Sequence, residues 1–157
     1  MITVGQALPT HVFNVLTADG MSNPTTADLF AGKKVVLFAL PGAFTPTCSA
    51  AHLPGYVVLA DELKAKGVDS IICLSVNDAF VMKAWGESKN AEQLIMLADG
   101  DASFSKALGL EQETGAFGGT RALRYAMIVE DAVVSYLAVE QGKEFEVSKA
   151  EHILAQL

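Results

Sequence analysis

The residue whose chemistry stands out is Cys48, one of two cysteines in the 157-residue chain. An apolar run at 35–40 predicts a buried strand before it, and a segment of helical character follows as far as Lys66. Thr45 suits an N-cap and Pro46 the first helical position, so we expect Cys48 in the first turn of a helix. Free backbone N–H groups and the helix dipole stabilise a thiolate there. We therefore interpret Cys48 as a reactive thiolate rather than the small buried hydrophobe that a lone cysteine usually is.

Two neighbours of Cys48 have more than one interpretation. Thr45 is an N-cap by type, and its hydroxyl can accept from the helix amides while it also faces a bound oxygen substrate. His52 lies four residues after Cys48, on the same helix face. It has the spacing of a base for the thiol, as in cysteine hydrolases, and equally that of a satisfied polar group beside the pocket. We favour the second, because the helix terminus already stabilises the thiolate.

Other residues narrow the choice of chemistry. Arg121 and Arg124 follow a Gly-rich loop, where two solvated strand-end charges are the simplest interpretation. A thiolate, however, needs a cation that is never deprotonated, and arginine supplies one with directed donors. Cys73 falls within an apolar run and is interpreted as a structural buried thiol. His11 and His152 have no zinc-ligand spacing, so no metal site is expected.

Composition excludes several function classes. The chain contains 51% hydrophobic residues and has a net charge of −7. The negative charge makes nucleic acid and anionic membranes poor candidate partners. No apolar run approaches the ~20 residues of a membrane-spanning helix. The first residues lack a basic region followed by an apolar segment, and two cysteines are typical of a reducing compartment. We therefore expect a cytoplasmic protein without a secretory signal.

The order of elements predicts an α/β fold in one domain, residues 1–157. Expected strands are 11–16, 35–40, 70–76, 94–98, 124–129 and 132–139. Expected helices are 26–31, 46–66 with a kink at Pro54, 78–86, 103–108 and 148–154, the last capped by Ser148. Residues 111–120 are expected to form a Gly-rich loop. This order is that of a thioredoxin-like fold with an N-terminal extension, in which helices flank a mixed central β-sheet.

The sequence around Cys48 resembles a known family. The stretch Pro41-Gly42-Ala43-Phe44-Thr45-Pro46-Thr47-Cys48 is similar to the P-x-x-x-T-x-x-C motif of the peroxiredoxins. Downstream, His52-Leu53-Pro54-Gly55 and Leu74-Ser75-Val76-Asn77-Asp78 resemble the type II/type V branch, and the resemblance runs nearly end to end. It implies a thioredoxin-like fold and thiol-dependent reduction of hydrogen peroxide and organic hydroperoxides, with no cofactor.

The resemblance also implies roles for single residues. It makes Cys48 the peroxidatic cysteine, with Thr45 and Pro41 shaping and shielding the pocket. The pocket arginine of the family falls on Arg124, and Arg121 is the second choice. The remaining candidates for the pocket are Gly42, Phe44, Thr47 and His52.

The chain departs from part of the branch in one respect. Some members carry a resolving cysteine near the C-terminal helix, whereas this chain has no cysteine after Cys73. We therefore expect no resolving cysteine and regeneration by an external thiol, either glutathione with glutaredoxin or thioredoxin. The family resemblance favours a homodimer. The competing hypotheses are a peroxide sensor that signals through oxidised Cys48 without efficient turnover, and a Cys48–His52 acyl transferase.

Overall fold

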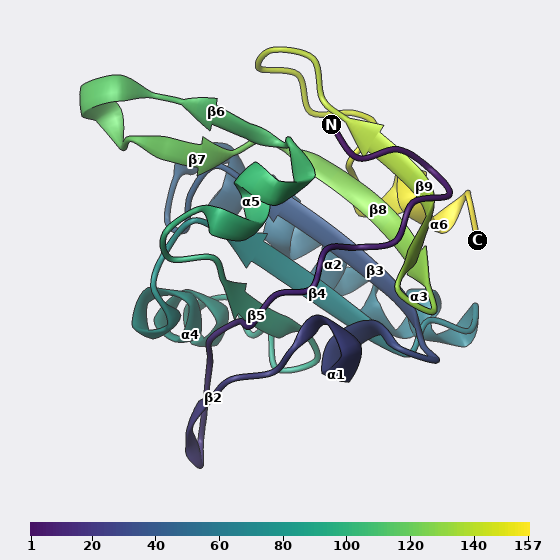
Figure 1. Cartoon of the computed structure of the whole chain (residues 1–157). Coiled ribbons are helices and arrows are strands. Elements are labelled where there is room, and N and C mark those ends of the chain that lie inside the picture. Colours follow the sequence, from purple (N-terminus) through teal and green to yellow (C-terminus); the bar gives the residue numbers. More distant parts are fainter.

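Five strands form the central sheet of the computed structural model, which describes residues 1–157. The sheet order is β5-β4-β3-β8-β9, and the strands are Ile95–Ala98, Ser70–Ser75, Lys34–Leu40, Tyr125–Glu130 and Val133–Val139. The first three strands of this order are parallel, and β8 and β9 run antiparallel to their neighbours (Figure 1). The mixed sheet with an antiparallel edge is the arrangement that the sequence predicts.

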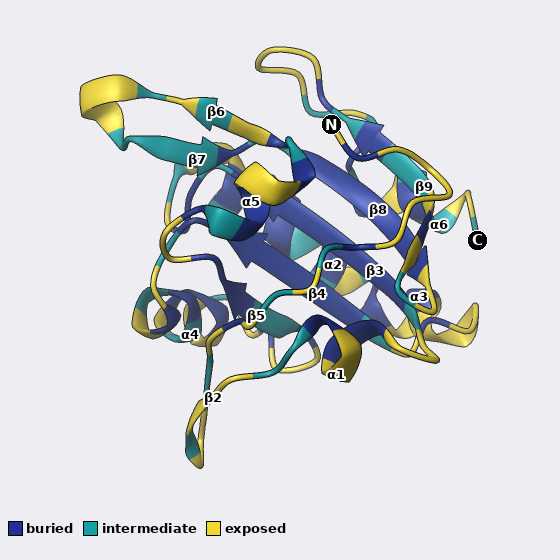
Figure 2. Cartoon of the chain, in the orientation of Figure 1, coloured by how far each residue is buried: buried dark blue, intermediate teal, exposed yellow.

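Two apolar layers bury both faces of the sheet. Side chains of β3 alternate between them, with Val36 and Phe38 in one layer and Val35 and Leu37 in the other. The first layer is covered by α2 (Leu53–Val58), α3 (Ala60–Ala65), α4 (Ala79–Ser88) and α6 (Ala150–Leu154). The second is covered by the N-terminal residues, α1 (Thr26–Phe30) and α5 (Ser103–Leu108). The middle strands are consequently buried along nearly their whole length (Figure 2).

Local capping explains where the short helices begin and end. Thr25 and Asp28 form a reciprocal capping box at the start of α1, and the Asp78 carboxylate accepts from the Val81 N–H at the start of α4. Gly109, with φ of 70°, ends α5 in the left-handed conformation. The predicted helices at these three places are confirmed, although α4 continues to Ser88 instead of ending at residue 86.

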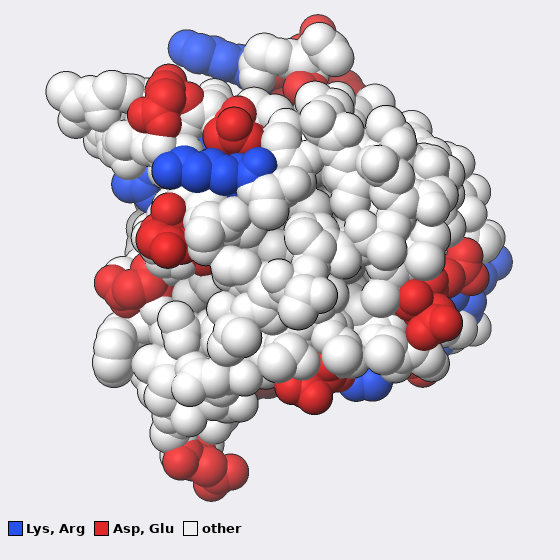
Figure 3. Space-filling view, in the orientation of Figure 1, with Lys and Arg blue, Asp and Glu red and all other residues white.

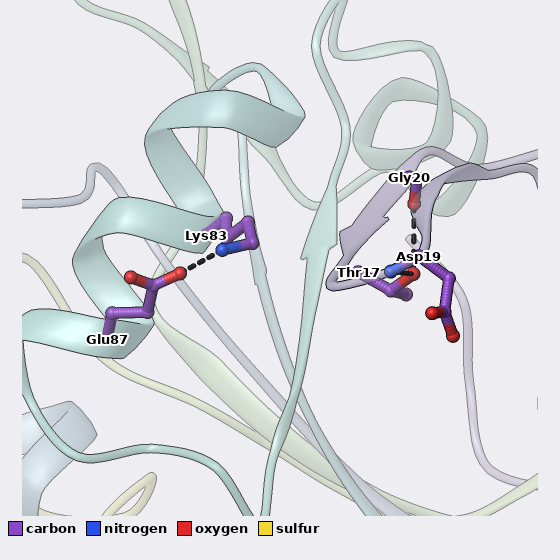
Figure 4. Close-up of polar contacts among 5 residues, drawn as sticks. All are labelled: Thr17, Asp19, Gly20, Lys83 and Glu87. Atoms are coloured by element: carbon purple, nitrogen blue, oxygen red, sulfur yellow. Dashed lines mark hydrogen bonds and ion pairs between the residues drawn. The ribbon is translucent and has the colours of Figure 1, made fainter.

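The N-terminal extension differs from the predicted strand 11–16. The strands are β1 (Val15–Thr17) and β2 (Gly20–Ser22), which form a small hairpin, and residues 11–14 make only isolated bridges. The Thr17 hydroxyl donates to the Gly20 carbonyl and accepts from the Asp19 N–H in its turn, beside the Lys83–Glu87 ion pair of α4 (Figure 4). Alternation at 11–14 reflects side chains packed onto the core, since the Phe13 and Phe104 rings lie 4.7 Å apart.

Residues 111–120 were expected to be a loop, and this prediction is wrong. They contain β6 (Glu111–Glu113) and a 3₁₀ turn (Gly115–Phe117), and β7 (Thr120–Ala122) completes a hairpin that projects from the body of the molecule (Figure 1). The Thr114 N–H and hydroxyl both donate to the Gly119 carbonyl, at 2.8 and 2.7 Å, and close the turn. The strands are short and mostly polar, so they lack the apolar alternation that predicts a hairpin.

Acidic side chains outnumber basic ones, 18 to 11, as the negative net charge requires. On the face shown in Figure 3, the charged groups lie toward the rim around a broad uncharged area, and the basic groups there form no continuous patch. None of the helices has the length and apolar character needed to cross a bilayer.

Candidate active site

Cys48 lies in the first helical turn after β3, beyond the loop of residues 41–45, and is completely buried. Helical geometry begins at Pro46, and the Ser49 N–H donates to the Thr45 carbonyl over 2.9 Å as the first bond of the turn. The backbone N–H groups of Thr47 and Cys48 have no acceptor within the protein. Cys48 therefore occupies the expected place in a first helical turn, where unpaired N–H groups favour negative charge.

The expected single helix over 46–66 is replaced by three segments. Cys48–His52 is a π-helix, in which the Leu53 N–H reaches back to the Cys48 carbonyl, and a break at Leu59 then separates α2 from α3. Pro54 explains the π-turn, since a proline has no N–H and its ring crowds the carbonyl four residues earlier. The sequence correctly predicts a disturbance at Pro54, but the structure places it in the turn that carries Cys48.

Arg124 approaches the sulfur of Cys48 from a distant part of the chain. Its Nη2 donates to Cys48 Sγ over 3.1 Å. Tyr125 is paired with Ala39 of β3 and points into the second layer, so the preceding Arg124 points toward the helices of the first layer. Strand register thus places a permanent positive charge beside the thiol.

Arg121, the second choice for this position, does not contact Cys48. Its Nε donates to the Gly118 carbonyl over 2.9 Å, and its Nη1 donates to the Val76 carbonyl over 2.8 Å. A Cβ added to Gly42 would lie 3.7 Å from Nη1 of Arg121, so the Arg121 side chain borders the loop that precedes Cys48. Arg121 therefore ties the β6–β7 hairpin to the loop after β4.

His52 is buried behind Arg124 and contacts the guanidinium, not the thiol. Nη1 of Arg124 donates to His52 Nδ1 over 2.8 Å, which places the ring proton on Nε2, 3.1 Å from the Ser148 carbonyl. Burial, followed by the charge of Arg124, lowers the pKa of His52 to about 3, although the bond to Ser148 opposes this shift. The ring is therefore neutral, and its lone pair is already occupied. This geometry does not support His52 as a base for Cys48.

The loop before Cys48 is held by its own polar contacts. Thr45 Oγ1 donates to the Gly42 carbonyl over 2.6 Å, so the prediction that its side chain accepts from the helix amides is wrong. The physical reason is that a close carbonyl competes for the hydroxyl proton. The Ala43 N–H donates to Asn77 Oδ1 over 3.0 Å, and the same oxygen accepts from Ser75. Sequence reasoning missed Asn77 as a support of the site, although its position directly after a buried strand was a signal.

The other predicted pocket residues belong to the same stretch of chain, between Pro41 and Thr47. Pro41 is half-buried, Gly42 is buried and Thr47 is exposed. Phe44 is exposed and has a φ of 63°, a conformation that non-glycine residues rarely adopt. Its ring lies 6.4 Å from that of Trp85, whose indole N–H donates to Ser49 Oγ.

A second loop, residues 140–149, covers the site from the C-terminal side, and we call it the covering loop. Ser148 was expected to cap the last helix, but its hydroxyl and N–H both donate to Glu140 Oε2, and Lys149 occupies the N-cap position of α6. Phe145 packs its ring 5.0 Å from that of His52, with the Arg124 guanidinium 5.7 Å from its centroid. The polar residues of this loop are typical of solvated turns, so the sequence pattern gave no indication that it covers the site.

Comparison with known proteins identifies the family. The family model described as Redoxin matches residues 3–154. Peroxiredoxin-2D of Arabidopsis thaliana is 45% identical and is matched over 99% of this chain and 98% of its own length. The chain belongs to the peroxiredoxins. A chloroplastic peroxiredoxin of Oryza sativa, Peroxiredoxin-2E-2, is 48% identical and is matched over 99% of this chain and 72% of its own length.

Solved structures place this peroxiredoxin among close structural relatives. The reduced Prx3 of Vibrio vulnificus in complex with hydrogen peroxide is 66% identical, with a TM-score of 0.98 and 99% of each chain covered. The oxidised form of the same protein has a TM-score of 0.93, 67% identity and full coverage of both chains. The thioredoxin-like fold and the type II relationship predicted from sequence are thus confirmed, and the protein is an enzyme, a thiol-dependent peroxidase.

Proposed function

We propose that Cys48 is the peroxidatic cysteine and that it reduces hydrogen peroxide and organic hydroperoxides through a sulfenic acid. The observation that carries this proposal is the 3.1 Å contact between Arg124 Nη2 and Cys48 Sγ at the start of a helix. A guanidinium stabilises the thiolate and does not transfer a proton to it, because arginine stays charged at all physiological pH values. Cys73 has no such partner and is buried within β4.

The reaction follows from these contacts. The Cys48 thiolate attacks the nearer peroxide oxygen, an S–O bond forms, the O–O bond breaks, and the farther oxygen leaves as hydroxide or alkoxide and takes a proton. Arg124 and the free N–H groups of Thr47 and Cys48 are the donors in the turn that carries the sulfur. The Thr45 hydroxyl, whose proton bonds the Gly42 carbonyl, offers its oxygen as an acceptor to a peroxide O–H. Charge moves from sulfur to the leaving oxygen, so donors placed there stabilise the transition state more than the bound peroxide.

We propose that an external thiol regenerates Cys48, either glutathione with glutaredoxin or thioredoxin. The sulfenic acid condenses with this thiol to a mixed disulfide and water, and a second thiol then releases reduced Cys48. Burial raises the pKa of the Cys73 thiol, so the side chain stays protonated and is a poor nucleophile. This supports a one-cysteine cycle. We propose a reducing, cytoplasmic setting for it, which the small number of cysteines favours.

A homodimer is the proposed assembly. Three phenylalanines are exposed, with fractions of 57% for Phe44, 66% for Phe80 and 81% for Phe117. Phe44 adjoins Thr45, and Phe117 is next to Gly118, whose carbonyl binds Arg121 beside the loop that precedes Cys48. Large exposed aromatic side chains near a functional loop favour a protein interface.

The decisive experiment compares peroxide turnover in the wild type, Cys48→Ser and Cys73→Ser with each of the two thiol systems. We expect Cys48→Ser to be inactive and Cys73→Ser to turn over with at least one thiol system. Retained activity in Cys48→Ser would refute the proposal. If Cys73→Ser is oxidised once but fails to turn over, the one-cysteine cycle is wrong. If the wild type is oxidised stoichiometrically and no thiol system supports turnover, the sensor hypothesis is favoured.

A further inference from the structure

A closed ring of hydrogen bonds surrounds the side of Arg124 that faces away from Cys48. The Glu140 N–H donates to the Arg124 carbonyl over 3.0 Å. Glu140 Oε2 accepts from the N–H and the hydroxyl of Ser148, at 2.8 and 2.6 Å. The Ser148 carbonyl binds His52 Nε2 at 3.1 Å, and His52 Nδ1 accepts from Arg124 Nη1 at 2.8 Å. The ring thus runs from Arg124 through His52, Ser148 and Glu140 and returns to the Arg124 backbone.

Each bond in the ring determines the direction of the next. A carbonyl oxygen only accepts, so Ser148 requires the proton of His52 on Nε2. The lone pair of Nδ1 is then free to accept from Arg124. The opposite tautomer would point an N–H at the guanidinium, whose nitrogens are all donors, and would release it. The Tyr56 hydroxyl occupies the second site on the Ser148 carbonyl, at 2.8 Å.

Glu140 holds the covering loop in this position. Besides Ser148, its Oε2 accepts from the Glu146 N–H over 2.8 Å. Although burial opposes ionisation, hydrogen bonds from Ser148 and Glu146 lower the pKa of Glu140, so it is a carboxylate that satisfies three donors. One charged oxygen at the end of β9 therefore anchors the segment that presents the Ser148 carbonyl.

We propose that Glu140 and Ser148 are positioning residues for the peroxidase reaction, acting through His52 to hold the Arg124 guanidinium against Cys48. A long arginine side chain has many rotamers, so a single contact to sulfur would hold it poorly. The ring of hydrogen bonds and the contact with Phe145 fix the conformation of the Arg124 side chain before peroxide binds. This inference rests on the proposed role of Cys48 and Arg124.

The experiment measures two properties of Cys48 directly. One is the second-order rate constant of its oxidation by hydrogen peroxide, followed by the fluorescence of Trp85. That residue is the only tryptophan, and it binds Ser49 Oγ over 2.9 Å, next to the reacting thiol. The other is the pH midpoint of Cys48 alkylation by iodoacetamide, with the modified residue located by mass spectrometry. A change that affects only stability leaves both properties unchanged in the folded protein.

The variants are Glu140→Gln, His52→Gln and the double variant. His52→Gln keeps a donor near Ser148 but loses the acceptor that Arg124 needs. We expect each single variant to slow oxidation by about 10- to 100-fold, the effect of small misplacements near a reacting atom, and to move alkylation to higher pH. Because both act through one ring, the double variant should be no slower than the slower single variant. Multiplying effects, or unchanged oxidation in Glu140→Gln, would overturn the proposal.

Two further variants separate positioning from stability. In His52→Asn the amide oxygen takes the place of Nδ1 and still accepts from Arg124, so oxidation should be faster than in His52→Gln. Equal rates in the two variants would contradict the proposal. His152→Asn is the matched control. His152 lies on α6, forms a 3.0 Å hydrogen bond with the Tyr136 hydroxyl and takes no part in the ring of hydrogen bonds around Arg124. If His152→Asn slows oxidation as strongly as His52→Gln, the loss of rate does not depend on the contact with Arg124, and the proposal fails. Cys48→Ser must abolish oxidation; if it does not, the proposed function itself fails.

Discussion

Arg124 Nη2 donates a hydrogen bond to Cys48 Sγ over 3.1 Å, although 76 residues separate the two in the chain. The same guanidinium donates from Nη1 to His52, so its two ends have different tasks. One end faces the reacting sulfur, and the other holds the group in place. A planar fork with fixed charge can do both, whereas a lysine ammonium is a single point charge on a flexible stem.

Arg124→Lys should therefore retain charge but lose alignment. We expect Arg124→Gln to lower the rate constant of Cys48 oxidation by about 10²–10³-fold, as for a removed transition-state donor, and Arg124→Lys to have a smaller effect. Stopped-flow fluorescence of Trp85 measures both. Arg121→Lys is the matched control, because Arg121 donates to two backbone carbonyls and does not contact the sulfur. This substitution should lower the stability of the protein more than the rate of oxidation. A stronger rate loss in Arg121→Lys would make Arg121 the pocket arginine.

Thr45 makes a separate prediction, because its hydroxyl proton is committed to the Gly42 carbonyl at 2.6 Å. The oxygen is then oriented to accept from a peroxide O–H. Thr45→Val should slow oxidation of Cys48 by about 10²-fold, while Thr45→Ser should retain most of the rate. The comparison uses the same single-turnover measurement with hydrogen peroxide. If Thr45→Val and the wild type react alike, the hydroxyl does not contact the substrate.

His52 should make the protein less stable in mild acid. Its pKa is about 3 in the folded protein and near 6.5 in the unfolded chain, so between these values only the unfolded chain binds the proton. The free energy of unfolding therefore rises with pH across this window and levels off above pH 6.5, with a limiting slope of about 1.4 kcal/mol per pH unit. Urea unfolding from about pH 4.5 to 7.5 measures this slope, above the range in which most carboxylates titrate. His52→Asn should flatten it; an equal slope in both proteins would contradict the assignment.

The π-turn predicts where the protein opens after oxidation. Residues 46–55 contain the π-turn and, after it, Pro54, so their backbone bonds are less regular than those of a continuous helix. Cys48 is buried, and a thiol reductant must reach its sulfenic acid. We expect amide hydrogen exchange across 46–55 to become faster on oxidation, while β3 and β4 keep their protection. Mass spectrometry of peptides from reduced and oxidised protein measures this, and unchanged exchange would count against local opening.

The fold and the placement of Cys48 were predictable from the amino-acid sequence alone. Apolar runs set β3 and β4, and Thr45-Pro46 set the start of the helical turn, because strand burial and helix entry depend on neighbouring residues. The motif around Cys48 was enough to indicate the family. Failures at 11–14 and 111–120 occurred where the element was short or where side-chain packing imitated strand alternation.

The groups that contact the sulfur could be identified only in the folded protein. Strand register turned Arg124 toward Cys48 and left Arg121 on the hairpin, since alternate residues of a strand face opposite layers. The Ser148 hydroxyl donates to the Glu140 carboxylate instead of capping α6 as predicted. The irregular turn caused by Pro54 lies at Cys48–His52 rather than at Pro54 itself. These choices depend on contacts between segments far apart in the chain, and no local pattern encodes them.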